Sequence, residues 1–384
     1  MTKTVRDTAS VAEDSFHKHY AAIWGEQRWA SLYQALALPT RHSALVNRYT
    51  PAQDFLESVD DAGLPAEQAQ GSVQGRGLQR LSFPTPRASE DVAHSDDNVL
   101  PDRTIVLKAF SPPRPSPSHP AHLMTHWNLD AASVILAHLL QVKPGDTVLD
   151  LCCAPGGKAI ALSQTLWPEH FADSPSPLPA RASRLVCNEA DPKRYKRLIE
   201  NLQSYLPPQL FKAGSVVTTK IDATSPSPAL GTGFDKVLVD APCSSERHVI
   251  HASVKAESAG TVAPEMANWR ASSSKRLART QLDLLMTALR AVKVGGHVTY
   301  ATCSISPTEN DGVIEKMLAL VEKERRKGQR WSVGLGFDDD EALVEALGQW
   351  AEPTKYGWIV LPDHPRGGRW GPLFFAMMKK IDGR

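Results

Sequence analysis

Short apolar runs and helically spaced apolar positions alternate along the last two thirds of the chain. The first such unit is Thr147-Val148-Leu149, which follows the turn-forming residues 143–146 and precedes helical spacing from Ala159 to Leu162. Six further runs are typical of strands, at residues 184–189, 215–221, 234–240, 296–302, 357–362 and 372–378. Helical patterns accompany them at residues 134–140, 192–206, 274–292 and 309–324. This alternation predicts an α/β fold with a mostly parallel seven-stranded sheet and helices on both faces.

The first third of the chain follows a different pattern. Aromatic and aliphatic residues between Phe16 and Leu38 recur mostly three and four positions apart, which predicts a helix with a buried aromatic face. Residues 57–100 are polar and predict a flexible stretch, residues 104–110 predict a strand, and the Pro/Ser-rich residues 111–120 predict extended chain. We therefore expect a mainly helical N-terminal extension over residues 1–120 and an α/β domain over residues 121–384.

Three other segments interrupt the α/β pattern. Residues 169–183 and 327–351 are predicted to be surface insertions. The stretch of about thirty residues after Asp240 is longer than a connection without structure should be, which favours a functional role for it.

Composition narrows the class of protein. The 384 residues suffice for two or three domains, and 42% apolar with 22% charged residues is typical of a folded core. The net charge is only +1, so a nucleic-acid partner would need a local basic surface. No apolar run approaches the roughly 20 residues of a membrane span, and we expect no membrane association. The N-terminus lacks the apolar segment of a secretory signal, and its acidic residues argue against a transit peptide.

The cysteines indicate an intracellular protein with reduced thiols. There are five, an odd number, and no Cys-x-x-Cys pair, so neither a disulfide framework nor a zinc site is expected. Each lies at or near the end of a predicted strand. We interpret Cys152 and Cys187 as small buried apolar residues.

Residues 150–158 read Asp-Leu-Cys-Cys-Ala-Pro-Gly-Gly-Lys and join the first predicted strand to its helix. A strand, a glycine turn and a helix N-terminus together present backbone N–H groups to a ligand. Gly156-Gly157 fits neither the dinucleotide-binding pattern nor a phosphate loop, so the alternative is that the glycines only turn the chain. Glu189 ends the second predicted strand, where nucleoside-binding folds place a ribose ligand; the alternative is a solvated cap for the next helix.

Two other predicted strands end in cysteine motifs. Asp240-Ala-Pro-Cys-Ser precedes one loop and Thr302-Cys303-Ser304 the other, and parallel strands present their carboxyl ends at one edge. We therefore expect Cys243 and Cys303 to be neighbours beside the glycine turn. A thiolate that adds to C6 of cytosine turns C5 into a nucleophile for an activated methyl group. Asp240 would hydrogen-bond the N3/N4 edge of the base, and the second thiol would assist release.

The motifs together resemble those of the Sun-domain (Nop/Sun, Fmu-like) RNA (cytosine-5) methyltransferases. Residues 152–158, 240–244 and 302–304 carry the likeness, and 128–133 and 371–376 also match in the right order. The likeness covers residues 120–384. The N-terminal stretch, with Ile23-Trp24-Gly25 and residues 44–47, is similar to the mitochondrial branch, which acts on rRNA or tRNA. The resemblance implies a Rossmann-like class I S-adenosylmethionine methyltransferase and a mitochondrial location, otherwise a cytoplasmic or nuclear one.

The resemblance also implies roles for single residues. Cys303 would attack, and Cys243 would assist release. DNA cytosine methyltransferases attack with the Pro-Cys thiol instead, so Thr302-Cys303 favours the RNA class. Asp240 would lie between base and cofactor, with Lys158 facing the reaction centre. S-adenosylmethionine would contact the remaining matched positions: Cys153, Ala154, Pro155, Gly156, Gly157, Lys158, Glu189, Arg194, Asp222 and Asp240.

Three positions depart from the family pattern. It usually has alanine at Cys153, threonine at Ala159 and aspartate at Glu189. The first two changes are modest in size, whereas Glu189 carries its carboxylate on a longer arm and changes the geometry of ribose binding.

RNA contacts are expected from basic residues near these motifs: Lys193, Arg194, Lys196, Arg197, Arg247, His248, Arg270, Lys275, Arg276 and Arg279. Each is equally consistent with a solvated helix face. Two other functions stay open: a catalytically silent RNA-binding or ribosome assembly factor, which the two thiols disfavour, and a small-molecule methyltransferase, which has no use for them. The sequence also leaves open whether a partner protein presents the RNA.

Overall fold

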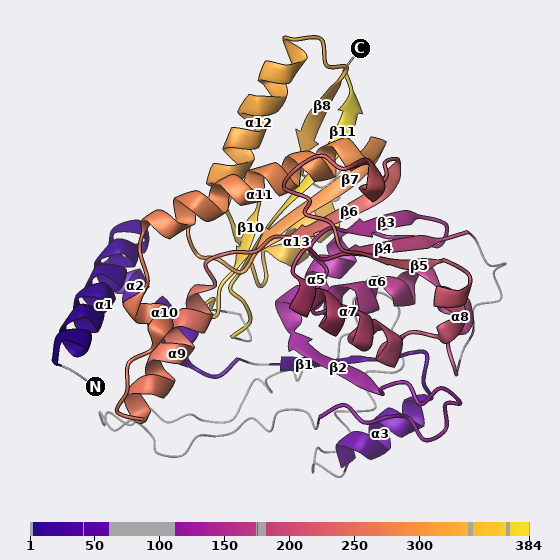
Figure 1. Cartoon of the computed structure of the whole chain (residues 1–384), viewed down its shortest axis with the longest axis horizontal. Helices are drawn as coiled ribbons and strands as arrows, with labels where there is room; N and C mark the ends of the chain where they lie inside the picture. Colours follow the sequence, from indigo (N-terminus) through magenta and orange to yellow (C-terminus); the bar gives the residue numbers. More distant parts are fainter. Residues whose placement is uncertain are drawn as a thin grey trace.

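The computed structural model describes residues 3–40, 42–60, 112–173, 175, 182–336, 341–365 and 369–383. A twisted sheet crosses the molecule, and the N-terminal helices α1 (Lys3–Trp24) and α2 (Glu26–Ala37) pack at one end of it (Figure 1). The predicted strand at 104–110 and residues 61–100 of the predicted flexible stretch lie outside the described residues. Residues 57–60 of that stretch are helical and belong to α3 (Ala52–Asp60).

The seven strands predicted for the α/β domain are all present in one sheet, and the described part of that sheet contains two more. Its order is β5-β4-β3-β6-β7-β11-β10-β9, and β8 pairs with β11. The first five strands are parallel to one another, and the remaining pairings are antiparallel. Their bounds are β3 (Thr147–Asp150), β4 (Arg184–Asn188), β5 (Val216–Thr219), β6 (Phe234–Asp240), β7 (Val292–Thr302), β8 (Trp331–Leu335), β9 (Glu352–Pro353), β10 (Trp358–Val360) and β11 (Leu373–Asp382).

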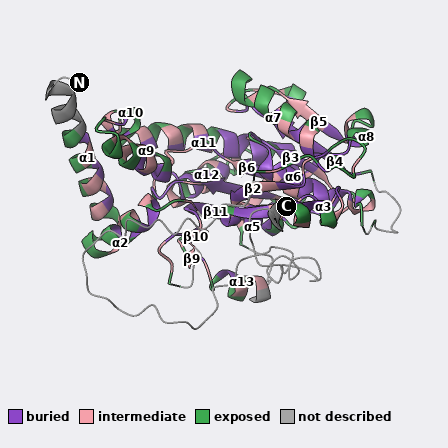
Figure 2. Cartoon of the chain, turned by 90° about the horizontal axis from the view of Figure 1, so that it is seen from below, coloured by how far each residue is buried: buried purple, intermediate pink, exposed green. Residues whose placement is uncertain are grey.

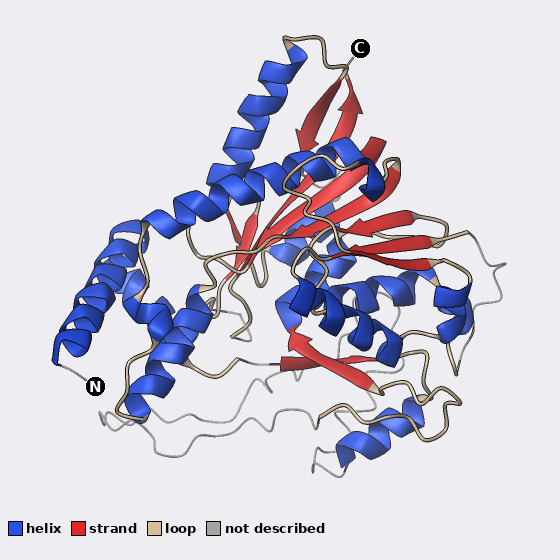
Figure 3. Cartoon of the chain, in the orientation of Figure 1, coloured by secondary structure: helices blue, strands red, loops and turns tan. Residues whose placement is uncertain are grey.

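Helices cover both faces of the sheet because its strands are apolar on both sides. Val148 and Leu238 belong to one core cluster, and their neighbours Leu149 and Val237 belong to the other. Helices α5 (Ala131–Leu139), α6 (Gly157–Leu166), α7 (Pro192–Tyr205) and α8 (Pro208–Lys212) cover the first face. Helices α11 (Ser272–Ala291) and α12 (Asp311–Arg325) cover the second (Figures 2 and 3). The predicted α/β architecture is therefore confirmed.

The strand order reverses between β3 and β6. From β3 the chain builds outward through β4 to β5, and it then returns to the other side of β3 to form β6 and β7. Ligands bind at such a reversal, beyond the carboxyl ends of the strands, because the two neighbouring loops there turn in opposite directions.

The N-terminal stretch forms two helices instead of the one predicted. The chain turns at Gly25, whose φ of 81° is accessible to glycine but strained for other residues. The turn folds α2 back so that Trp29 stacks on Tyr20 and lies beside Phe16, which makes one buried aromatic cluster. The apolar spacing continues across the break between α1 and α2, so the glycine at position 25 was the residue in the sequence that indicated the break.

Two predicted loops also contain regular structure. The segment after Asp240 forms α9 (Glu246–Ser258) and α10 (Pro264–Ala267), which pack beside α1. Within 327–351, β8 adds a strand to the sheet edge, and α13 (Glu341–Leu347) follows. The segment 169–183 begins with the short helix η2 (Pro168–His170), and most of its remainder lies outside the described residues.

Three small elements complete the described chain. Strand β1 (His42–Val46) pairs with β2 (His126–Asp130) in a separate two-stranded sheet, which ties the N-terminal extension to the segment before α5. The short helix η3 (Pro228–Leu230) precedes β6. No helix within the described ranges is long and apolar enough to cross a membrane.

Candidate active site

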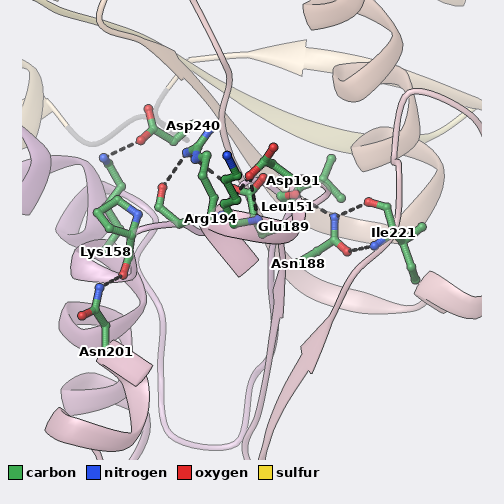
Figure 4. Close-up of polar contacts among 12 residues, drawn as sticks. Leu151, Lys158, Asn188, Glu189, Asp191, Arg194, Asn201, Ile221 and Asp240 are labelled. Atoms are coloured by element: carbon green, nitrogen blue, oxygen red, sulfur yellow. Dashed lines mark hydrogen bonds and ion pairs between the residues drawn. The ribbon is translucent and has the colours of Figure 1, made fainter. Parts of the chain in front are cut away.

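The glycine turn after β3 is held in place by helix α7. Gly156 caps α6 with a φ of 115°, and a Cβ there would lie 3.3 Å from Leu198 Cδ1. The Arg194 guanidinium donates to the carbonyl of Ala154 at 2.8 Å, and Asn201 donates to the carbonyl of Pro155 at 2.7 Å (Figure 4). The turn is therefore a rigid surface at the sheet edge.

Cys153, at the start of this turn, has a buried thiol. Its side chain is buried against Cys187 and Asp150, and burial raises the pKa of the thiol well above its usual range. Its amide donates to the carbonyl of Asn188, the last residue of β4. Cys187 is fully buried in β4, as predicted, whereas Cys152 is half-buried.

Glu189 is a buried carboxylate, and one of its oxygens accepts no hydrogen bond. Its Oε1 accepts from the Asp191 amide at 3.0 Å, whereas Oε2 has no hydrogen-bond partner and lies 3.5 Å from Arg194 Nη2. Asp191 is the residue that caps α7, because it accepts from the amides of residues 193 and 194. The alternative role of Glu189 as a solvated helix cap is therefore wrong.

Asn188 was missed by the sequence analysis. Its side-chain amide donates to the carbonyls of Leu151 and Ile221, and its oxygen accepts from Thr219 Oγ1 and the Ile221 amide. One buried side chain thus joins the ends of β3, β4 and β5. The feature of the sequence that could have identified Asn188 is a side-chain amide at the end of an otherwise apolar strand.

Asp222 lies exposed after β5. Its Oδ1 accepts from the hydroxyl and the amide of Thr224, and these hydrogen bonds lower the pKa of the carboxyl. No hydrogen bond or ion pair joins Asp222 to the glycine turn or to Glu189 among the described residues.

Lys158 and Asp240 meet where the strand order reverses. Lys158 Nζ lies 2.6 Å from Asp240 Oδ2, and both side chains are mostly buried (Figure 4). Burial alone would lower the pKa of Lys158, but the Asp240 carboxylate outweighs it and the pKa is raised. Lys158 therefore stays protonated and paired.

Asp150, below this pair, was not predicted as a site residue. Its side chain is fully buried, and burial raises the pKa of the carboxyl to about 7, aided by the nearby charge of Asp240. The Cys152 amide and the Cys153 thiol lie close to it but make no well-formed hydrogen bond with it.

The two cysteine loops meet as expected. Cys243 follows β6, Cys303 follows β7, and their sulfur atoms are 2.9 Å apart as free, half-buried thiols. Ser245 Oγ lies 3.0 Å from Cys303 Sγ. The hydrogen bond from Cys243, together with that from Ser245, lowers the pKa of Cys303, while donation to Cys303 and burial raise the pKa of Cys243. The pair is thus asymmetric, with Cys303 as the readier thiolate.

A second missed feature lies where residues 128–133 and 371–376 come together. The Gly371 amide donates to both carboxylate oxygens of Asp130, at 3.0 and 3.1 Å, and Asp130 also caps α5. Arg247 donates to the Gly371 carbonyl and lies 3.8 Å from Asp130. Arg247 is buried in these contacts, so its predicted role in contacting RNA is wrong.

The other predicted RNA-contacting residues lie on the surface. They are exposed on α7 and its start, at the start of α9, and around the beginning of α11: Lys193, Arg194, Lys196, Arg197, His248, Arg270, Lys275, Arg276 and Arg279. No group of three or more potential metal ligands occurs within the described part of the chain.

The five parallel strands, the glycine turn and the paired strand tips define a Rossmann-like methyltransferase. A family model described as 16S rRNA methyltransferase RsmB/F matches residues 137–341. The chain belongs to this family of RNA (cytosine-5) methyltransferases, as its motifs predicted.

Named relatives extend over nearly the whole chain. The mitochondrial tRNA (cytosine(34)-C(5))-methyltransferase of Mus musculus is 31% identical, over 98% of this chain and 92% of that protein. The 5-cytosine rRNA methyltransferase NSUN4 of Bos taurus is 29% identical, over 97% and 89%. The crystal structure of NSun6 from Pyrococcus horikoshii with SFG, only 15% identical, matches with a TM-score of 0.58 over 95% of this chain and 97% of that one. At that identity it shows a shared fold.

Proposed function

We propose that this protein methylates C5 of cytosine in an rRNA or a tRNA, through a covalent adduct between Cys303 and C6 of the base. The observation that carries the proposal is the pair of thiols 2.9 Å apart beside Lys158 and Asp240. Single buried cysteines are common in cores, but two half-buried thiols at adjacent strand tips, one with a lowered pKa, are a nucleophile and its partner.

The adduct accounts for both thiols. The Cys303 thiolate adds to C6, and the electrons of the C5–C6 double bond become available at C5. S-adenosylmethionine, when bound, supplies an electrophilic methyl group to C5. Loss of the C5 proton to water restores the double bond as the bond between C6 and sulfur breaks, and Cys303 leaves as a thiolate. Cys243 donates a hydrogen bond to that sulfur in the free protein, and the same bond stabilises the departing thiolate.

Asp240 and Lys158 position and polarise the base. The Asp240 carboxylate would accept a hydrogen bond from the N4 amino group of cytosine and so orient the base. A proton shared between this carboxylate and N3 withdraws electron density from the ring, which favours addition at C6. Lys158 holds Asp240 through their 2.6 Å ion pair, and its charge also favours a thiolate at Cys303.

The residues around the glycine turn fit S-adenosylmethionine. Glu189 Oε2 is buried, accepts no hydrogen bond and has only the 3.5 Å ion pair with Arg194, so it can accept from a ligand, and ribose hydroxyls are suitable donors. The backbone from Cys153 to Lys158 would hold the methionine part, and Asp222 would hold the adenine edge. Arg194 would support this surface through its contacts with Ala154 and Glu189.

RNA would bind through the exposed cations of α7 and the start of α11, with the target cytosine turned out of its stack to reach the thiols. We assign residues 121–384 to catalysis and residues 1–120 to an extension that contacts RNA. The names of the relatives support a mitochondrial location and an rRNA or tRNA substrate. A protein partner that presents the RNA is compatible with this assignment.

Transfer of a labelled methyl group to RNA tests the proposal. Wild-type protein, incubated with methyl-labelled S-adenosylmethionine and total RNA from a source lacking its own activity, should place label in 5-methylcytosine. Cys303→Ala should lose at least a thousandfold in rate, because the nucleophile is gone. Cys187→Ala, at a thiol buried in β4, is the control and should retain activity. Label in cytosine with Cys303→Ala at the wild-type rate would disprove the nucleophile, and no label with any RNA would favour the catalytically silent RNA-binding factor.

A further inference from the structure

Both cysteine loops rest on one buried carboxylate. Glu246, the first residue of α9, is fully buried. Its Oε1 accepts from the hydroxyls of Ser244 and Ser304, the residues that follow Cys243 and Cys303, and its Oε2 accepts from the Ile305 amide at 3.0 Å. The two serine hydroxyls are also 2.9 Å apart. Glu246 therefore joins the two loops one residue beyond their sulfur atoms.

The remaining donor to Glu246 comes from the N-terminal extension. Tyr20 of α1 donates its hydroxyl to Glu246 Oε1 at 2.6 Å, across 226 positions of the sequence. The Tyr20 ring is fully buried, stacks on Trp29 and contacts Phe16 and Trp269. The hydroxyl is thus held by a packed aromatic cluster.

The same helices also fix α9 itself. His251 Nε2 lies 2.9 Å from the carbonyl of Leu38, the residue that ends α2, and α1 lies beside α9 and α10 in Figure 1. The carboxylate of Glu309 approaches the loops from the other side and accepts from the Ser244 amide at 3.0 Å. A second buried carboxylate nearby makes the donors to Glu246 more important, because the two charges repel.

We propose that Tyr20 is a positioning residue for methyl transfer: its hydroxyl orients Glu246, and Glu246 sets the spacing of the Cys243 and Cys303 thiols. This inference rests on the proposed function of those thiols. It gives the N-terminal extension a role in the chemistry in addition to any contact with RNA.

Tyr20→Phe tests the inference, because it removes one hydroxyl and keeps the ring. We expect kcat to fall about tenfold, as for a lost hydrogen bond to a buried charge, while KM for RNA and for S-adenosylmethionine changes less than twofold. The pH midpoint for alkylation of Cys303 should rise, since the thiols lose their spacing. Tyr33→Phe is the matched control: Tyr33 lies in α2 and packs on His17 and Trp29, away from the loops. It should leave kcat, both KM values and the alkylation midpoint unchanged.

A double-mutant cycle separates positioning from general destabilisation. Glu246→Gln alone should also lower kcat, and Tyr20→Phe/Glu246→Gln should fall no further than the lower of the two single variants, because the residues act as a unit. Additive losses, or a Tyr20→Phe enzyme that matches Tyr33→Phe in kcat and in Cys303 alkylation, would overturn the inference. If the wild type methylates no RNA but Tyr20→Phe still shifts the alkylation midpoint relative to Tyr33→Phe, the proposed function fails and the spacing role stands.

Discussion

Two chemically identical side chains acquire different properties at this site because of their neighbours. Cys303 accepts hydrogen bonds from Cys243 and Ser245, which lower its pKa, whereas Cys243 donates and is buried, which raises its pKa. A thiol that ionises readily suits attack, and one that keeps its proton suits assistance to a leaving sulfur. The hydrogen bond between them therefore supports the proposed roles, attack for Cys303 and assistance to release for Cys243.

This asymmetry predicts the pH dependence of alkylation. With a lowered pKa, more of Cys303 is thiolate at a given pH, so its reaction with iodoacetamide should reach half-maximal rate at a lower pH than a free cysteine. Cys243→Ala removes a donor and should move that midpoint upward by about one pH unit, a value typical of one hydrogen bond to a charged group. Mass spectrometry of peptides alkylated between pH 6 and pH 10 measures both. A downward shift in Cys243→Ala would contradict the assigned direction of the hydrogen bond.

Single residues at the strand tips were predictable, and the contacts between them were not. Asp240, Cys243 and Cys303 follow apolar runs, so their place at one sheet edge followed from parallel pairing. Glu246 and Asn188 are polar residues whose partners come from elements far apart in the sequence, which no local pattern reveals. The burial of Arg247 was also not predictable from the sequence, because an arginine next to an exposed histidine has no local pattern that indicates burial.

At the scale of elements, the two sides of α7 differ. One side of the helix holds the glycine turn through Arg194 and Asn201, and Lys196 and Arg197 face solvent. Helix α11 has the same division, with Gln281 buried beneath the Cys243 loop and donating to the Pro242 carbonyl, and with exposed cations in its first turns. Each helix thus has one side that packs against the candidate site and another side whose exposed cations are able to bind phosphate.

The start of α11 provides a test of RNA binding. Lys275→Ala/Arg279→Ala removes two exposed cations four residues apart, and we expect RNA affinity to fall about tenfold with a smaller salt dependence. Lys316→Ala/Lys323→Ala removes two exposed cations from α12 and should change affinity less than twofold. Fluorescence anisotropy with a labelled RNA at several salt concentrations measures both. Equal losses in the two variants would show that the cations of α11 only contribute to the net charge.

At the scale of the whole molecule, the sequence predicted the central sheet and its covering helices better than the N-terminal helices and the long connecting segments. Seven apolar runs alternating with helical spacing predicted the α/β sheet, because buried strands and amphipathic helices have distinct periods, and five of the seven strands are parallel. The break at Gly25, the helices after Ser245 and the strand at Trp331–Leu335 were missed. The N-terminal break and α9 depend on packing between the two ends of the fold, which a local period does not encode.

That packing joins the N-terminal helices to the α/β domain. Helix α1 contacts the loops through Tyr20, and Arg28 of α2 pairs with Glu352 at 2.6 Å and Asp363 at 2.9 Å. These contacts tie the first forty residues to the last part of the sheet. The N-terminal helices therefore contact both the start of α9 and the C-terminal part of the sheet.

The most direct test of the central claim is a covalent complex with RNA. Cys243→Ala keeps the attacking thiol but lacks the donor that helps it leave, so it should accumulate a protein–RNA band that survives denaturing electrophoresis when S-adenosylmethionine is supplied. The double variant Cys243→Ala/Cys303→Ala should give no band, because no bond to C6 can form. Peptide mapping of the band should place the nucleotide on Cys303. A nucleotide on another residue, or a band of equal strength from the double variant, would contradict the account.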